Sequence, residues 1–174
     1  MSLLVLAYPK LKIEDFDRIQ DIRKKHDTRY YNAVNPHFTI VFPVFKLEKN
    51  KFSEAVSKVA AGINTISFIL KCAVIVKDFF SDYTDIFLVP DEGYSYIVKL
   101  HDKLYSGILK NELRLDIPFI PHIGVGGYTS PAESKAVADD LNKSNFIIEG
   151  IIDKLDIVNY NYPEIETIKE IKLI

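Results

Sequence analysis

Apolar residues recur along this chain at two different periods, which predict a mixture of strands and helices. Apolar, β-branched and aromatic runs predict strands at residues 3–8, 37–42, 66–76, 85–89, 119–128, 147–158 and 165–173. Apolar positions three and four residues apart predict helices at residues 13–25, 52–63, 94–110 and from residue 130 onward. Strands joined by short turns pair antiparallel, so the order of elements predicts an α+β fold with flanking helices.

Three local signals mark where these elements begin and end. The helix at residues 13–25 has acidic residues early and basic residues late, which suits the helix dipole. Ser130, Pro131 and Glu133 resemble a capping box, which predicts the start of the last helix. Pro43 has no backbone N–H to donate, so we expect it to end the strand at residues 37–42.

Composition limits the class of protein more than it identifies one. The 174 residues are 48% hydrophobic, which is enough to bury a core and excludes a disordered chain. A single Cys cannot form a disulfide within the chain, and a free thiol suits a reducing compartment. The apolar start is short, lacks a preceding basic segment, and no later run is long enough to cross a membrane. We therefore expect a cytoplasmic, monomeric protein that folds as one domain over residues 1–174 without membrane association.

Charge is distributed unevenly although the net charge is only −2. Residues 1–60 contain 11 Lys and Arg against 7 Asp and Glu, whereas residues 61–174 contain 11 against 17. The small net charge argues against non-specific binding of long nucleic acids, and the uneven distribution favours the first half of the chain as the host of an anionic ligand.

One motif occurs twice. Pro36-His37-Phe38-Thr39 and Pro121-His122-Ile123-Gly124 lie 85 residues apart, about half the chain, and each is followed by further apolar residues. Side chains alternate between the two faces of a strand, so His37 and Thr39 share one face, as do His122 and Gly124. If the halves are related by an approximate two-fold axis, both histidines point into one cleft.

Two facing imidazoles suit in-line displacement at phosphorus. One ring removes a proton from the attacking oxygen while the other delivers a proton to the departing oxygen, and histidine can do either near neutral pH. The Thr39 hydroxyl is placed to bond a non-bridging phosphate oxygen, whereas Gly124 has no hydroxyl and offers only its backbone. The sequence does not decide which histidine is the acid and which is the base.

The paired motifs, His37 to Ile40 and His122 to Val125, resemble those of the 2H phosphoesterase superfamily, the LigT or 2′-5′ RNA ligase-like group. The resemblance implies a bilobal fold with two pseudo-symmetric antiparallel sheets, flanking helices and a central cleft. It also implies metal-independent action, with no cofactor, on 2′,3′-cyclic phosphates or on 2′-5′ or 3′-5′ phosphodiesters of RNA termini and nucleotides. His37 and His122 would be general acid and base, and Thr39 would hold phosphate. Gly124 departs from the family pattern, which has Ser or Thr there.

Further residues are candidates for binding the substrate. Tyr128 and Thr129 are close enough in sequence to replace the hydroxyl that Gly124 lacks. Arg29, in the loop before the first motif, could clamp a phosphate, and a solvated loop is the alternative. The missing hydroxyl leaves open an alternative function, a catalytically weakened module that binds RNA or nucleotides with the same fold. A purely structural domain would require the two histidines to lie far apart.

The remaining candidates are expected to be structural. His26 and His101 are predicted to be solvent-exposed, and Phe42, Phe45, Phe79 and Phe80 are expected mostly to pack in the core rather than to bind a base. His37 and His122 are too few to hold a metal ion, and no third ligand follows at a typical spacing. We therefore predict no metal site.

Overall fold

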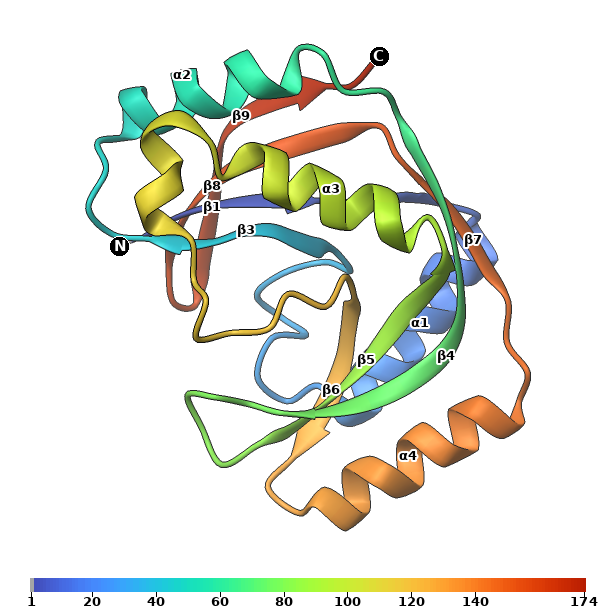
Figure 1. Ribbon diagram of the computed structural model, residues 1–174. Helices are drawn as coiled ribbons and strands as arrows, with labels where there is room; N and C mark the ends of the chain where they lie inside the picture. The colour runs from blue at the N-terminus through green and yellow to red at the C-terminus, as the bar shows by residue number, and fades with distance from the viewer. Residues whose placement is uncertain (1) are drawn as a thin grey trace.

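The computed structural model describes residues 2–174 and confirms the α+β class, with two antiparallel sheets flanked by helices (Figure 1). Along the chain the elements are β1 (Ser2–Ala7), β2 (Lys10–Leu11), α1 (Ile13–His26), β3 (Phe38–Val44), α2 (Lys49–Ala60), β4 (Ile66–Lys77), β5 (Thr84–Glu92), α3 (Tyr94–Leu104), the 3₁₀ helix η1 (Gly107–Glu112), β6 (Ile123–Tyr128), α4 (Pro131–Lys143), β7 (Ile148–Ile152), β8 (Lys154–Asn161) and β9 (Glu164–Lys172).

The strand that follows each histidine motif lies at the edge of a sheet. One sheet has the order β3-β1-β8-β9 and the other has the order β2-β7-β4-β5-β6, so β3 and β6 are both edge strands. An edge strand tolerates a missing N–H, and β3 accordingly runs through Pro43 to Val44. The expectation that the strand would stop at Pro43 was therefore wrong.

The two sheets are joined by a segment that the sequence presents as one long strand. Residues 147–158 were predicted to be continuous, but β7 belongs to the five-stranded sheet and β8 to the four-stranded sheet, with Asp153 between them. Hydrophobic periodicity does not distinguish one strand from two strands in line, because the change of sheet depends on which partners pair with each half.

The helices pack against both sheets. Helices α1 and α4 pack on the five-stranded sheet, α2 packs on β9 of the four-stranded sheet, and α3 contacts β3 of one sheet and β4 and β5 of the other (Figure 1). The Ser130 hydroxyl accepts a hydrogen bond from the Glu133 N–H at the start of α4, as predicted. Helix α3 ends at Leu104 instead of Lys110, because the backbone leaves the helical region at Tyr105 and is extended at Ser106. The chain continues as η1 from Gly107, whose φ of 56° lies in the left-handed region.

The hydrophobic core is continuous between the sheets. Buried side chains of the four-stranded sheet, such as Val5 and Ile40, belong to the same cluster as Phe68 and Leu88 of the five-stranded sheet. The rings of Phe38 and Phe68 meet edge to face with centroids 5.0 Å apart, which joins β3 to β4. Burying such a side chain stabilises the fold by roughly 1.5–3 kcal/mol, so the core fixes how the two motif strands are placed.

Two histidines differ from their predicted exposure. His101 is 3% exposed, its Nδ1 lies 2.8 Å from the carbonyl oxygen of Ile40, and its ring stacks on Phe119 at 3.6 Å. The prediction of a solvated His101 was therefore wrong, because α3 turns this residue towards β3. His26, at the end of α1, is half-buried rather than solvated. Among residues 2–174 no helix combines the length and the hydropathy that a membrane span needs.

Candidate active site between the two sheets

A cavity of about 310 Å³ lies between the sheets and contains both motif histidines. Leu4, Leu6, Val158 and Tyr160 line it from the four-stranded sheet. Asp85, Phe87, Gly124 and Gly126 line it from the five-stranded sheet. The structural alternative, with histidines far apart in the fold, does not match this arrangement.

The two histidines are oriented by the same kind of backbone hydrogen bond. The Nδ1 atom of His37 lies 2.8 Å from the carbonyl oxygen of Asn35, and that of His122 lies 2.6 Å from the carbonyl oxygen of Ile120. A carbonyl can only accept, so each Nδ1 carries the proton and donates it. In the neutral ring Nε2 is then the free proton acceptor. The proline between each histidine and its carbonyl partner fixes φ and helps to set this geometry.

Burial depresses the basicity of both rings. It lowers the pKa of His37 from 6.5 to about 4, with the Asn35 carbonyl opposing the shift. It likewise lowers the pKa of His122 to about 4, with the Ile120 carbonyl opposing the shift and the charge of His37 contributing to it. Both rings are therefore neutral near pH 7 in the empty cavity. Binding an anion beside them would favour the protonated form.

Each histidine ring contacts an aromatic side chain from the sheet of its own motif strand. His37 meets Tyr8 edge to face, with ring centroids 5.9 Å apart, and Tyr8 directly follows β1. His122 stacks on Phe87 of β5 at 3.5 Å with the planes 11° apart. Phe87 pairs in register with Gly124 on β6, so the aromatic ring covers the strand beside the residue that has no side chain.

Thr39 and Gly124 lie where the strand period predicted. Thr39 lines the cavity with His37, and Gly124 lines it with His122. A Cβ built on Gly124 would meet no heavy atom within 4 Å. The position that lacks a hydroxyl therefore has open space where a Ser or Thr side chain would fit.

Tyr128 does not reach the cavity. Its hydroxyl lies 2.6 Å from Nδ1 of His26, and the side chain is absent from the residues that line the histidine cavity. Tyr128 is at the end of β6 opposite Thr84, where the last residue of α1 covers the strand. The expectation that Tyr128 replaces the missing hydroxyl was wrong, because α1 occupies its polar group.

Arg29 lines the cavity but is already paired with acidic residues. Its Nη1 lies 3.0 Å from Oδ2 of Asp78, and its Nη2 bonds to Oδ1 of Asp85. The guanidinium also lies 4.1 Å from the centroid of the Tyr83 ring. The arginine is therefore held in place by two carboxylates and an aromatic face, instead of standing free to bind phosphate.

Sequence reasoning missed Asp85 and Phe87. Strand alternation places these two residues on one face of β5, and that signal was present in the sequence. Their position beside His122 and Gly124 depends on the register between β5 and β6, which includes a bulge between Ile86 and Phe87. Burial raises the pKa of Asp85 to about 6, with the charge of Arg29 opposing this shift.

A second arginine of the cavity wall is also paired. Arg23 is 2% exposed, and its Nε and Nη2 lie 3.1 and 3.0 Å from Oδ2 of Asp27. Its Nη2 also donates to the carbonyl oxygen of Tyr30, and Oδ1 of Asp27 accepts from the Tyr30 N–H. These bonds tie the end of α1 to the loop that carries Arg29.

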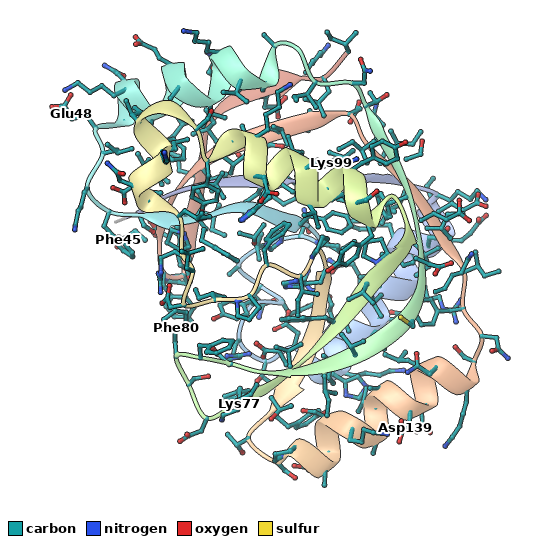
Figure 2. The ribbon with its side chains drawn as sticks, in the orientation of Figure 1. Phe45, Glu48, Lys77, Phe80, Lys99 and Asp139 are labelled. Atoms are coloured by element: carbon teal, nitrogen blue, oxygen red, sulfur yellow. The ribbon has the colours of Figure 1, made fainter. Side chains whose placement is uncertain are left out.

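An aromatic cavity of about 470 Å³ adjoins the first and shares His122, Thr39 and Phe87 with it. Phe45, Phe79 and Phe80 line it and are 67%, 57% and 70% exposed, so the expectation that they pack in the core was wrong. Figure 2 shows Phe45, beyond β3, and Phe80, in the β4–β5 turn, at the same edge of the molecule. The Arg114 guanidinium lies 5.3 Å from the centroid of the Phe80 ring.

No group of three or more His, Cys, Asp or Glu side chains in residues 2–174 is arranged to hold a metal ion. The polar side chains of the histidine cavity are instead two imidazoles, one threonine hydroxyl, the tyrosines Tyr30 and Tyr160, and two arginines paired with Asp27 and Asp85. This set is suited to moving protons and contacting phosphate oxygens.

Two relatives with curated names cover nearly the whole chain. A protein of Geobacillus sp. (strain WCH70), named provisionally as a phosphoesterase, is 29% identical over 163 residues, which are 91% of this chain and 87% of the relative. A provisionally named phosphoesterase of Bacillus anthracis is 24% identical over 159 residues, with 91% and 88% covered.

Solved structures share the fold at low sequence identity. The Thermus thermophilus protein TT0787 matches with a TM-score of 0.64 and 13% identity, covering 99% of this chain and 98% of its own. E. coli LigT without ligand matches with a TM-score of 0.56 and 17% identity, covering 99% and 96%. The sequence profile of the 2′-5′ RNA ligase superfamily matches residues 9–163. The chain therefore belongs to the 2′-5′ RNA ligase superfamily, as the two histidine motifs suggested.

Proposed function

We propose that this protein is a metal-independent phosphodiesterase acting on RNA termini or nucleotides, with a 2′,3′-cyclic phosphate or a 2′-5′ or 3′-5′ phosphodiester as substrate. The observation that carries the proposal is the matched pair of Nδ1 contacts in one cavity, to Asn35 and to Ile120. Each contact leaves Nε2 as the atom that exchanges a proton. Membership of the superfamily and the names of the relatives support phosphoesterase activity.

The reaction uses the two rings in opposite protonation states. The neutral ring takes a proton from the attacking oxygen as the new P–O bond forms, and the protonated ring gives its proton to the departing oxygen as the old P–O bond breaks. The Thr39 hydroxyl donates to a non-bridging oxygen. Since both rings have a low pKa in the empty cavity, the anionic substrate itself promotes the uptake of the proton that the acid needs.

Ligands bound in solved structures of the same fold support nucleotides as the substrate class. Structures of E. coli LigT have been solved with 3′-AMP, with ATP and with phosphate. In this chain the apolar walls and the exposed phenylalanines beside His122 offer aromatic faces to a base.

The test is a panel of 2′,3′-cyclic nucleotides and of 2′-5′ and 3′-5′ dinucleotides, with and without EDTA, analysed by chromatography. We expect turnover of at least one class, unchanged by EDTA and lowered by roughly 10²–10⁴ in the His37→Gln/His122→Gln double variant. His26→Gln is the matched control, because this half-buried histidine lies outside the cavity. Wild-type turnover in the double variant would contradict the proposal.

A second candidate function is a nucleotide-binding module without turnover, and the hydroxyl missing at Gly124 favours it. This candidate predicts that a nucleoside 2′-monophosphate binds in calorimetry while the whole panel stays unchanged. It also predicts that Gly124→Thr does not create turnover.

A further inference from the structure

The charges around the histidine cavity are balanced before any ligand enters. Arg23 is paired with Asp27, and Arg29 with Asp85, so the four charged side chains that line the cavity sum to zero. Asp78, which lies 3.0 Å from Arg29 and adds a further negative charge, lines only the adjoining aromatic cavity. Among the described residues that line the pocket, both arginines are thus paired and neither is free for an anion.

The histidines add no resident charge near pH 7, since burial lowers the pKa of both to about 4. In the proposed reaction one ring is protonated when the substrate is bound, and this proton contributes one positive charge. One positive charge matches the single negative charge of a phosphodiester. A phosphomonoester with two negative charges leaves one of them unmatched beside Asp85.

We propose that Asp85 is a specificity-determining residue which, by holding Arg29, makes the cavity accept singly charged phosphodiesters and disfavour doubly charged phosphomonoesters. The inference rests on the proposed function, because it requires phosphate to bind between His37 and His122. In this role Asp85 discriminates between singly and doubly charged phosphate groups, and it does not transfer a proton.

Asp85 is the acidic residue placed to act in this way. It lines both cavities, and it lies on the same face of β5 as Phe87, whose ring stacks on His122. Asp27 instead bonds to the buried Arg23 and to the Tyr30 N–H, so its charge is used within the fold. Asp78 lies in the β4–β5 turn and accepts from Ser81 and Phe80 as well as Arg29.

The charge balance also favours release of the product over release of the substrate. Hydrolysis of a diester converts one negative charge into two, because the product monoester loses a second proton above about pH 6. Asp85 then repels the product more strongly than the substrate. The cavity is expected to release the monoester readily and to be inhibited weakly by inorganic phosphate.

The test compares two ligands that differ by one charge. Calorimetry at about pH 8 measures the Kd of a nucleoside 2′-monophosphate, which is doubly charged there, and the Kd of its methyl ester, which is singly charged. In Asp85→Asn we expect the ratio of the monoester Kd to the ester Kd to fall by about tenfold, which is about 1.4 kcal/mol. Asp91→Asn is the matched control, because Asp91 lies on the same strand and pairs with Lys71 at an exposed surface.

A double variant, Arg29→Gln/Asp85→Asn, tests whether the gain in relative affinity for the monoester depends on Arg29. We expect the ratio to return towards the wild-type value, because the cation released by Asp85→Asn is then absent. Binding of both ligands with a ratio unchanged in Asp85→Asn, or changed equally in Asp91→Asn, would contradict the role of Asp85 alone. A gain that persists in the double variant would contradict the role of Arg29. No binding of either ligand by folded protein would contradict the proposed function and this role together.

Discussion

The strands β3 and β6 carry the two copies of the histidine motif, and they differ in what surrounds an otherwise matched imidazole. Both are edge strands, and both histidines bond through Nδ1 to the carbonyl oxygen two residues earlier. On β3 the second residue after the histidine is Thr39, whereas on β6 it is Gly124. The backbone contact that places the proton on Nδ1 is thus present in both copies. The hydroxyl that would contact phosphate is present only at Thr39.

The neighbouring strands increase this difference. Beside β3, Tyr8 meets His37 edge to face, and the cavity wall is apolar at Leu6. Beside β6, Phe87 stacks on His122, and Asp85 holds Arg29. The β3 side of the cavity therefore presents a hydroxyl, while the β6 side presents an open backbone and a paired cation. This asymmetry can orient a substrate although the motifs are symmetric.

The comparison is tested most strongly by removing each histidine alone. We expect His37→Gln and His122→Gln each to lower kcat/KM by roughly 10²–10⁴, because in the proposed reaction each ring makes one of two proton transfers. Since the proposed reaction uses both rings in one step, the double variant should lose little more than either single variant. Steady-state kinetics on whichever substrate the panel identifies provides the measurement.

Unequal losses would change the interpretation of the motif. If one variant kept wild-type kcat/KM, then only one copy would act on substrate, and the matching Nδ1 contacts would be a structural repeat. Circular dichroism and thermal unfolding of both variants serve as controls that the cavity is still formed.

A smaller effect is expected from exchanging the residues that differ between the copies. Gly124→Thr places a hydroxyl in open space, so we expect kcat to rise by up to about tenfold, near the 1–1.5 kcal/mol of an added hydrogen bond. Thr39→Val removes the existing hydroxyl at nearly constant volume and should lower kcat by a similar or larger factor. Single-turnover kinetics separates these changes from product release.

The two variants control for each other, since one adds and the other removes the same group. A fall in kcat for Gly124→Thr, with Thr39→Val unchanged, would mean that phosphate does not lie between the two positions. No turnover in Gly124→Thr or in the wild type, together with nucleotide binding, would favour the binding module.

Sequence patterns predicted the parts of the site that depend on local structure. Strand alternation placed His37 with Thr39 and His122 with Gly124, and the repeat predicted that the two pairs would meet in one cavity. The patterns failed where contacts come from distant elements. Tyr128 is engaged by His26 of α1, and Arg29 is paired with Asp78 and Asp85, which lie about 50 residues later.

The same distinction applies to the fold. Periods of two and of 3.6 residues predicted the class and most elements, because burial on one face leaves a local pattern. The change of sheet at Asp153 and the burial of His101 were missed, since both depend on which strands lie beside them. Phe79 and Phe80 were predicted to lie in the core but are exposed. Hydrophobicity alone does not show whether the side chains of a turn face the core or the solvent.

The last expected effect concerns stability instead of rate, and it asks whether burial shifts the pKa of the two histidines alike. Each has a pKa of about 4 in the folded protein and an ordinary value of 6.5. Between these values the unfolded chain binds protons that the folded chain does not, so the free energy of unfolding falls as pH falls through this window. Each ring contributes on the order of 1–3 kcal/mol to the loss.

Asp85 opposes this trend, because burial raises its pKa to about 6 and the folded protein binds its proton first. The histidine contribution is therefore isolated by comparing variants. We expect the decrease in unfolding free energy between about pH 7 and about pH 4.5 to be smaller in His37→Gln and in His122→Gln than in the wild type, by similar amounts. Urea unfolding at the two pH values measures it. Equal decreases in all three proteins would mean that neither ring is held neutral, and a difference in only one variant would show that the asymmetry of the site extends to its proton chemistry.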